Sequence, residues 1–144
     1  MNEIYYIQRS IKQCTSQLDE NNIRIRKLRD RIIELEYIKH KLRGTQEKLY
    51  DYRSIKRRHF VRMKESLSNV KFASECSDEM LRFIDGNRAS SAHDNIDSAI
   101  AETKNEIRRK EAEIRDLESK NYYLKNRIIN LNEKMLELEN KRGD

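Results

Sequence analysis

The sequence predicts an all-α protein, an elongated antiparallel helical hairpin or coiled coil with a short helical tip. The 144 residues include no Pro and only three Gly, so the residues that build most turns are scarce. Charged residues make up 39% of the chain and the hydrophobic set 36%. Isoleucines and leucines recur at helical spacing. No stretch approaches the roughly 20 apolar residues that cross a bilayer, so we expect no membrane span.

The expected organisation is a single domain over residues 1–144, with a first arm at 3–50, a tip at 51–89 and a second arm at 90–140. Alternating steps of three and four residues from Ile4 to Leu49 give fourteen positions, of which eleven are apolar. The same steps from His93 to Leu138 give fourteen positions, of which ten are apolar. Sustained stripes of this period, flanked by charges, are typical of coiled-coil helices.

The two stripes fit each other in one antiparallel register. When Asn21 is placed opposite Asn121, paired residue numbers add to 142, and apolar positions meet apolar positions along most of both arms. Leu28 then faces Ile114, while Ile32 facing Lys110 is a mismatch that a long lysine stem can tolerate. We expect Asn21 and Asn121 to set the register, because a slip would leave both buried amides unpaired. A parallel homodimer, with each arm pairing to its own copy, is the alternative.

Charge favours pairing of the two arms. Residues 1–50 carry 11 basic and 7 acidic groups, whereas residues 72–144 carry 13 and 16. A basic first arm beside an acidic second arm is favourable, although each exposed pair contributes only a few tenths of a kcal/mol.

The tip is expected to contain a second helix. The first helix is predicted to run to about residue 70, with Gly44 as a possible bend, and residues 72–76 are predicted to break it. Ser77 resembles an N-cap and Gly86 a C′ residue, and the last helix is predicted to start near Ser90 or Ser91. The apolar tip residues either form a small core or face a partner.

Residues 53–64 form the densest basic run, in which phosphate binding is one interpretation and a solvated helix face the favoured one. A basic membrane-surface helix is a weaker interpretation.

The sequence does not suggest an enzyme. His40, His59 and His93 are scattered, and no catalytic or metal-binding motif occurs, so we expect no catalytic residue, metal, cofactor or small-molecule ligand. Cys14 lies on the first stripe and is expected to be a reduced core residue. The N-terminus shows no basic region followed by an apolar core, which favours a cytoplasmic location.

The layout resembles a known family. A heptad arm (Ile11–Leu18, Ile32–Glu36) leads to an irregular middle with an aromatic-to-glycine step at Phe83 and Gly86, followed by a long helix with Glu111–Glu118. This layout is similar to the YwqH-like family of helical proteins associated with type VII secretion, encoded with LXG-type toxins and similar to WXG-like hairpins. The family tends to have a Trp-x-Gly step, whereas here Phe83 replaces the Trp and the spacing is one residue longer.

The resemblance implies a non-catalytic targeting chaperone that binds the helical N-terminal LXG domain of a cognate toxin. A second small helical protein is a further expected partner. Export with the partner, by a route that needs no signal peptide, is then the alternative to a cytoplasmic location. The expected partner-binding residues are apolar positions outside the stripes and in the tip: Ile33, Ile38, Phe60, Met63, Leu67, Phe83, Gly86, Tyr122 and Ile129. The competing hypotheses are a homo-oligomeric coiled-coil scaffold and, less favoured, a basic nucleic-acid-binding protein.

Overall fold

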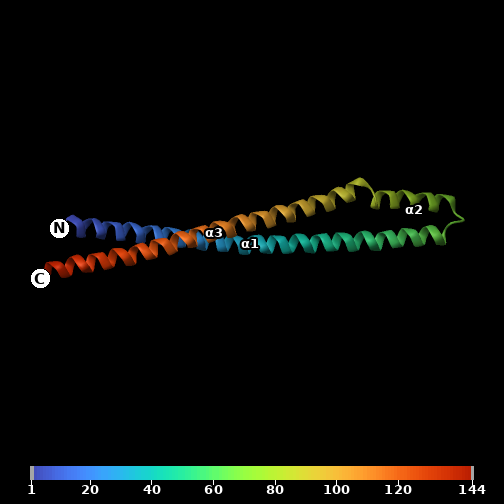
Figure 1. Cartoon of the computed structure of the whole chain (residues 1–144). Helices are drawn as coiled ribbons and strands as arrows, with labels where there is room; N and C mark the ends of the chain where they lie inside the picture. The colour runs from blue at the N-terminus through green and yellow to red at the C-terminus, as the bar shows by residue number, and fades with distance from the viewer. Residues whose placement is uncertain (1, 144) are drawn as a thin grey trace. The chain divides into compact units, whose positions relative to one another are not determined.

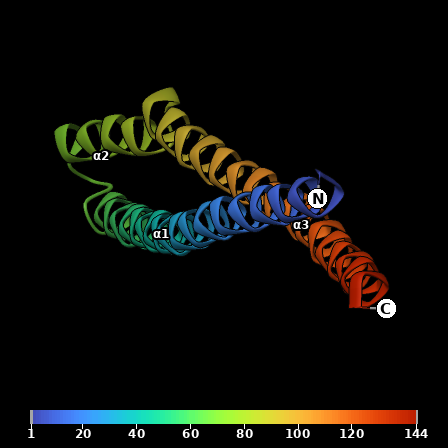
Figure 2. The ribbon, with the colours of Figure 1, turned by 90° about the vertical axis from the view of Figure 1, so that its left-hand side faces the viewer.

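A computed structural model describes residues 2–143, and these residues form an all-α helical hairpin. Helix α1 spans Asn2–Ser66, α2 spans Lys71–Ile84 and α3 spans Asn87–Gly143, with no strand among the described residues. Figures 1 and 2 show the chain reversing its direction after α1, so that α3 runs antiparallel to it. The fold class predicted from the heptad stripes is confirmed.

The described chain divides into two compact units. The first unit combines residues 2–34 of α1 with residues 107–143 of α3, and the second contains residues 35–106. Each unit pairs a stretch of α1 with helix from later in the chain. The two units are described separately below.

The first unit is held together by the predicted seam. Its central cluster contains Ile25, Leu28 and Ile114, with Ile32 and Leu117 packed against them. Leu28 is only 2% exposed, the lowest value of any apolar side chain described. Leu28 with Ile114 and Ile25 with Leu117 are pairs of the predicted register. Across both units, all fourteen positions of each stripe are buried or half-buried, which the three-four spacing requires.

The second unit packs α2 against the last turns of α1. Lys64 forms an ion pair with Asp78 at 2.6 Å and Arg57 one with Asp85 at 3.5 Å. Arg53 Nη2 donates a hydrogen bond to the carbonyl oxygen of Ile84 at 3.0 Å. In both ion pairs, the α1 residue nearer the turn pairs with the α2 residue nearer the turn, so α2 runs antiparallel to the end of α1.

The break before α2 lies earlier than the sequence predicts. Helix α1 continues through Gly44 and ends at Ser66, and residues 67–70 form the turn, in which Val70 N–H donates to the Leu67 carbonyl at 2.9 Å. The predicted break at residues 72–76 is wrong, because those residues belong to α2.

The N-cap assigned to Ser77 is also wrong. Ser77 is fully buried inside α2, and its Oγ donates to the carbonyl oxygen of Ala73 at 2.9 Å. Asp78 follows Ser77 as an acidic residue of a first helical turn would, but it forms an ion pair with Lys64. Val70 occupies the N-cap position without any side-chain cap.

The junction between α2 and α3 changes which residues face α1. Gly86 occupies the predicted C′ position after α2, since Asp85 is the C-cap. The last helix begins at Asn87, not near Ser90 or Ser91, because Ser90 N–H already donates to the Gly86 carbonyl at 3.2 Å. Continued backward from His93, the seam spacing of α3 would place residues 82 and 79 inward, but Leu81 and Ser77 face inward instead.

Candidate partner-binding surface

Four side-chain amides meet inside the first unit. Asn21 Nδ2 donates to Asn121 Oδ1 at 2.9 Å, and Asn121 Nδ2 donates to Asn22 Oδ1 at 3.0 Å. Gln17 Nε2 donates to Asn21 Oδ1 at 2.8 Å. Asn21 and Asn121 are buried, so this network satisfies groups that would otherwise be costly to remove from water. The structure therefore brings the two predicted register residues into contact.

Two ion pairs mark the two sides of the seam in the first unit. Arg24 Nε lies 3.0 Å from Glu113 Oε1 on one side, and Arg29 Nη2 lies 2.9 Å from Glu118 Oε1 on the other. These residues occupy the seam-flanking positions of antiparallel coiled coils. The four side chains are 42–62% exposed, so the pairs orient the helices more than they stabilise them.

A second apolar line runs along the outside of α3 in the first unit. Tyr122, Ile129 and Leu136 are spaced by seven residues and are 70%, 53% and 56% exposed. We call these three residues the α3 stripe. Tyr122 follows Glu118 by one helical turn, which places the stripe on the side marked by the Arg29–Glu118 ion pair.

Helix α1 contributes Tyr5 and Ile33 to this same side, at the same heptad position. The register places Tyr5 level with residue 137, one residue from the level of Leu136 on the opposite helix, and Tyr5 is 60% exposed. Ile33 lies level with residue 109, so about 20 Å of helix separates it from Tyr122. Tyr5 therefore extends the α3 stripe, whereas the predicted Ile33 is exposed but isolated from Tyr122 and Ile129.

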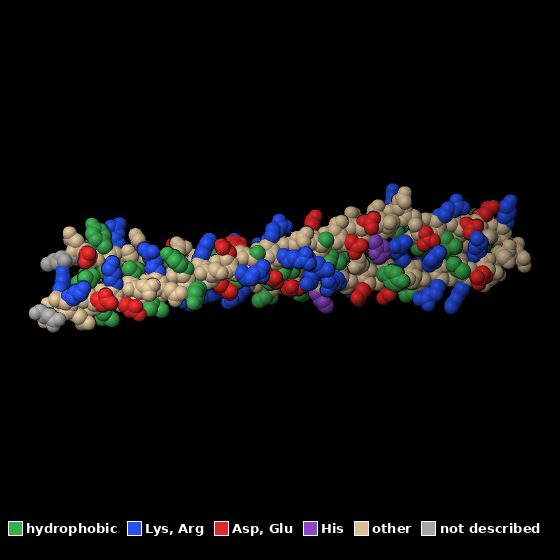
Figure 3. All heavy atoms as spheres, viewed as in Figure 1, with side chains coloured by type: hydrophobic (Ala, Val, Ile, Leu, Met, Phe, Trp, Pro, Cys, Tyr) green, Lys and Arg blue, Asp and Glu red, His purple; other side chains and the backbone are tan. Residues whose placement is uncertain are grey.

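The other predicted partner-binding residues lie in the second unit. Phe60, Met63 and Gly86 are half-buried, whereas Ile38, Leu67 and Phe83 are exposed. Phe83 belongs to α2 and Leu67 to the turn that precedes it. On the face of the molecule shown in Figure 3, the hydrophobic side chains are interspersed with Lys, Arg, Asp and Glu.

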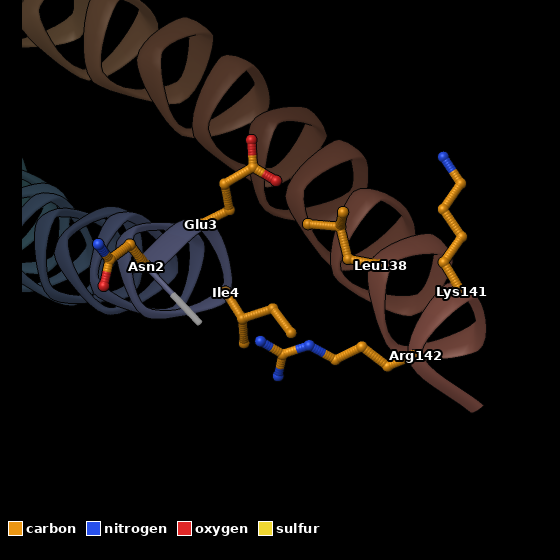
Figure 4. A pocket seen from close by; sticks show the side chains of 6 residues that line it. All are labelled: Asn2, Glu3, Ile4, Leu138, Lys141 and Arg142. Carbon is orange, nitrogen blue, oxygen red and sulfur yellow. The ribbon is translucent and has the colours of Figure 1, made fainter. Parts of the chain in front are cut away.

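The first unit also opens at the helix ends. A hollow of about 510 Å³ lies between the start of α1 and the end of α3, with Ile4 and Leu138 on its walls. Figure 4 shows these two side chains from opposite helices, with Arg142 beside Ile4. The terminal layer of the seam is consequently only half-buried.

Among residues 2–143, no group of three or more His, Cys, Asp or Glu could hold a metal ion. Within that range, no helix is long and apolar enough to cross a membrane. Cys14 is buried and Cys76 half-buried, and both are free thiols. No family model, curated protein or solved structure matches this chain.

Sequence reasoning missed Leu136, Tyr5, Asn22 and Gln17. The seven-residue spacing of Tyr122, Ile129 and Leu136 is visible in the sequence, but these positions lie outside the two main stripes. Gln17 stands one turn before Asn21, a spacing at which amides commonly pair. Asn22 gave no signal, because its role depends on the opposite helix.

Proposed function

We propose that this protein is a non-catalytic helical partner that binds the N-terminal LXG domain of a cognate toxin and accompanies it to the type VII secretion machinery. The observation that carries the proposal is the α3 stripe. Its three residues are exposed although the seam of the hairpin is already filled. A further helix laid beside α3 would cover them and convert two helices into a bundle.

The chemistry of the surface fits a helical ligand. The α3 stripe repeats with the heptad period, so a partner helix can contact one stripe residue every two turns. Lys125 and Glu133 lie between the stripe residues and are exposed, which supplies charges for selecting the partner. Tyrosine is enriched at protein interfaces, whose buried centre is surrounded by a polar rim.

The binding test uses the LXG domain of a toxin encoded beside this gene, purified with the full chain. We expect a stable complex, and we expect Ile129→Asp to weaken it by at least tenfold. Ile23→Asp is the matched control, because Ile23 is 51% exposed in the same unit and lies outside the α3 stripe. Equal weakening by both substitutions, or no complex with the wild-type chain, would contradict the proposal.

Nucleic-acid binding is less well supported by the basic run. Arg53, Arg57 and Lys64 are engaged by α2, through the Ile84 carbonyl, Asp85 and Asp78 respectively. Lys56 lies over the ring of Tyr52 at 5.6 Å. Few cations of the run therefore remain for phosphates. Binding to duplex DNA that falls steeply between about 50 and 200 mM salt would favour this alternative.

A further inference from the structure

We infer that α2 is a self-association helix, which pairs antiparallel with α2 of a second copy of this chain. This inference goes beyond the proposed function, because it concerns a different surface in the second unit. It starts from an apolar arc on α2 that α1 only partly covers.

Helix α2 has two apolar faces. Ala73, Ser77, Leu81 and Ile84 lie on the face that packs inward, where Ser77 is fully buried. Phe72, Cys76, Met80 and Phe83 lie within a neighbouring sector of about 80°. We call these four residues the α2 stripe.

The α2 stripe remains exposed in the single chain. Phe72 is 79% exposed, Phe83 68% and Met80 44%, while Cys76 is half-buried. Two largely exposed phenylalanines on one 14-residue helix are unfavourable in water, since each can bury about 150–250 Å². Covering these two phenylalanines with another apolar surface would therefore be favourable.

A second copy fits because the stripe is self-complementary. Antiparallel pairing about the midpoint of α2 joins residues whose numbers add to 155, so the whole of Lys71–Ile84 overlaps its copy. Phe72 then meets Phe83 of the second copy, and Phe83 meets Phe72. Cys76 of one copy comes within one residue of the level of Met80 of the other copy. This reciprocal pairing is the defining property of a twofold interface.

Charge and area set the expected strength. Glu75 and Arg82 lie on the same flank of the stripe and come within two residues of each other's level across the axis, which is attractive. Glu79 meets Glu75 of the second copy on that flank, which is repulsive. Two copies would bury roughly 1,000 Å² in total, near the lower limit for a specific interface. We therefore expect a weak dimer, with a dissociation constant on the order of 10–100 µM.

Sedimentation of the full chain between micromolar and several hundred micromolar tests the association. The wild-type chain should shift from monomer to dimer, and Phe83→Asp should raise the dissociation constant at least tenfold. Tyr50→Asp is the control, since Tyr50 is 66% exposed on α1 and lies outside the stripe. Glu79→Lys should tighten the dimer severalfold, because it replaces a repulsion by an attraction. Circular dichroism checks that each variant keeps its helix content.

Cross-linking tests the orientation. We would mix a Cys14→Ala chain, which keeps Cys76, with a Cys14→Ala, Cys76→Ser, Met80→Cys chain. Antiparallel pairing predicts disulfides mainly between the two different chains. A chain that stays monomeric at all concentrations, or a dimer insensitive to Phe83→Asp, would overturn the proposal. Cys76–Cys76 bridges between two copies of the first chain, formed in the mixture in preference to bridges between the two different chains, would also overturn it.

Discussion

Single buried amides are the most consequential polar residues of the first unit. Asn21 occupies a seam position where a leucine would pack better, yet its side chain both donates to Asn121 and accepts from Gln17. Such a residue lowers stability relative to an apolar one but penalises competing arrangements. Its value can be measured through two different substitutions.

Removing one amide should destabilise the protein. Asn21→Ala leaves Asn121 Oδ1 buried without its donor, so we expect a loss of about 1–3 kcal/mol in the free energy of unfolding. Thr15→Ala is the control, because Thr15 is exposed and bonds only to the Ile11 carbonyl one turn earlier. Urea denaturation measures both variants. An Asn21→Ala protein as stable as the wild type would show that the amide network contributes nothing.

Removing both amides should instead allow α1 and α3 to pair in a second register, shifted by one heptad. A slip by one heptad would still pair apolar residues, such as Ile25 with Leu124 and Ile32 with Leu117. It would place Asn21 and Asn121 opposite Ile128 and Leu28, and Lys39 opposite Lys110. Asn21→Leu with Asn121→Leu should therefore increase stability while permitting the slipped pairing. Cysteines at positions 25 and 124 would report it by forming a disulfide only in the leucine variant. A bridge in the asparagine-containing protein would contradict the predicted role.

At the scale of helices, the arms and the end of the tip helix before Gly86 could be predicted, whereas the start of that helix could not. Both stripes are periodic over seven heptads, so a local error in one position hardly affects the assignment. The tip helix is short, and its side chains contact α1 as well as residues of their own helix. Ser77 with Asp78 has the pattern of a helix start, but Ser77 donates to the Ala73 carbonyl within α2 and Asp78 pairs with Lys64 of α1. The change of facing residues at Gly86 has no local signature at all.

Gly44, inside α1, and Gly86, between α2 and α3, should respond oppositely to alanine. A Cβ on Gly44 meets nothing within 4 Å, so Gly44→Ala should stabilise the protein by about 0.5–1 kcal/mol through lower backbone entropy of the unfolded chain. A Cβ on Gly86 would lie 2.8 Å from the Arg82 carbonyl oxygen, so the α2–α3 junction would have to shift. Gly86→Ala should therefore destabilise. Thermal unfolding of both variants checks the difference in sign, and two changes of the same sign would contradict this explanation.

For the whole molecule, burial is distributed unevenly between the units. The cluster around Leu28 and Ile114, with Ile7, Cys14 and the amide pair, belongs to the first unit. In the second unit only Leu35, Ser77 and Ile100 are buried. The sequence carries part of this difference, because Lys39, Gln46, His93 and Thr103 interrupt the stripes within the second unit. Local stability should follow burial, since opening a segment costs the contacts that it makes.

Hydrogen exchange should therefore rank the segments. We expect the amides near Leu28 and Ile114 to exchange slowest and those of α2 fastest among the interior helical positions, at a protein concentration of about 1 µM, where weak self-association is negligible. Raising the concentration to several hundred micromolar should then slow exchange in α2 selectively, because the second copy would cover Phe72 and Phe83. Protection in α2 equal to that at Leu28 in the dilute sample would show that α2 is stabilised within the single chain, and the exposed stripe would then need no covering surface.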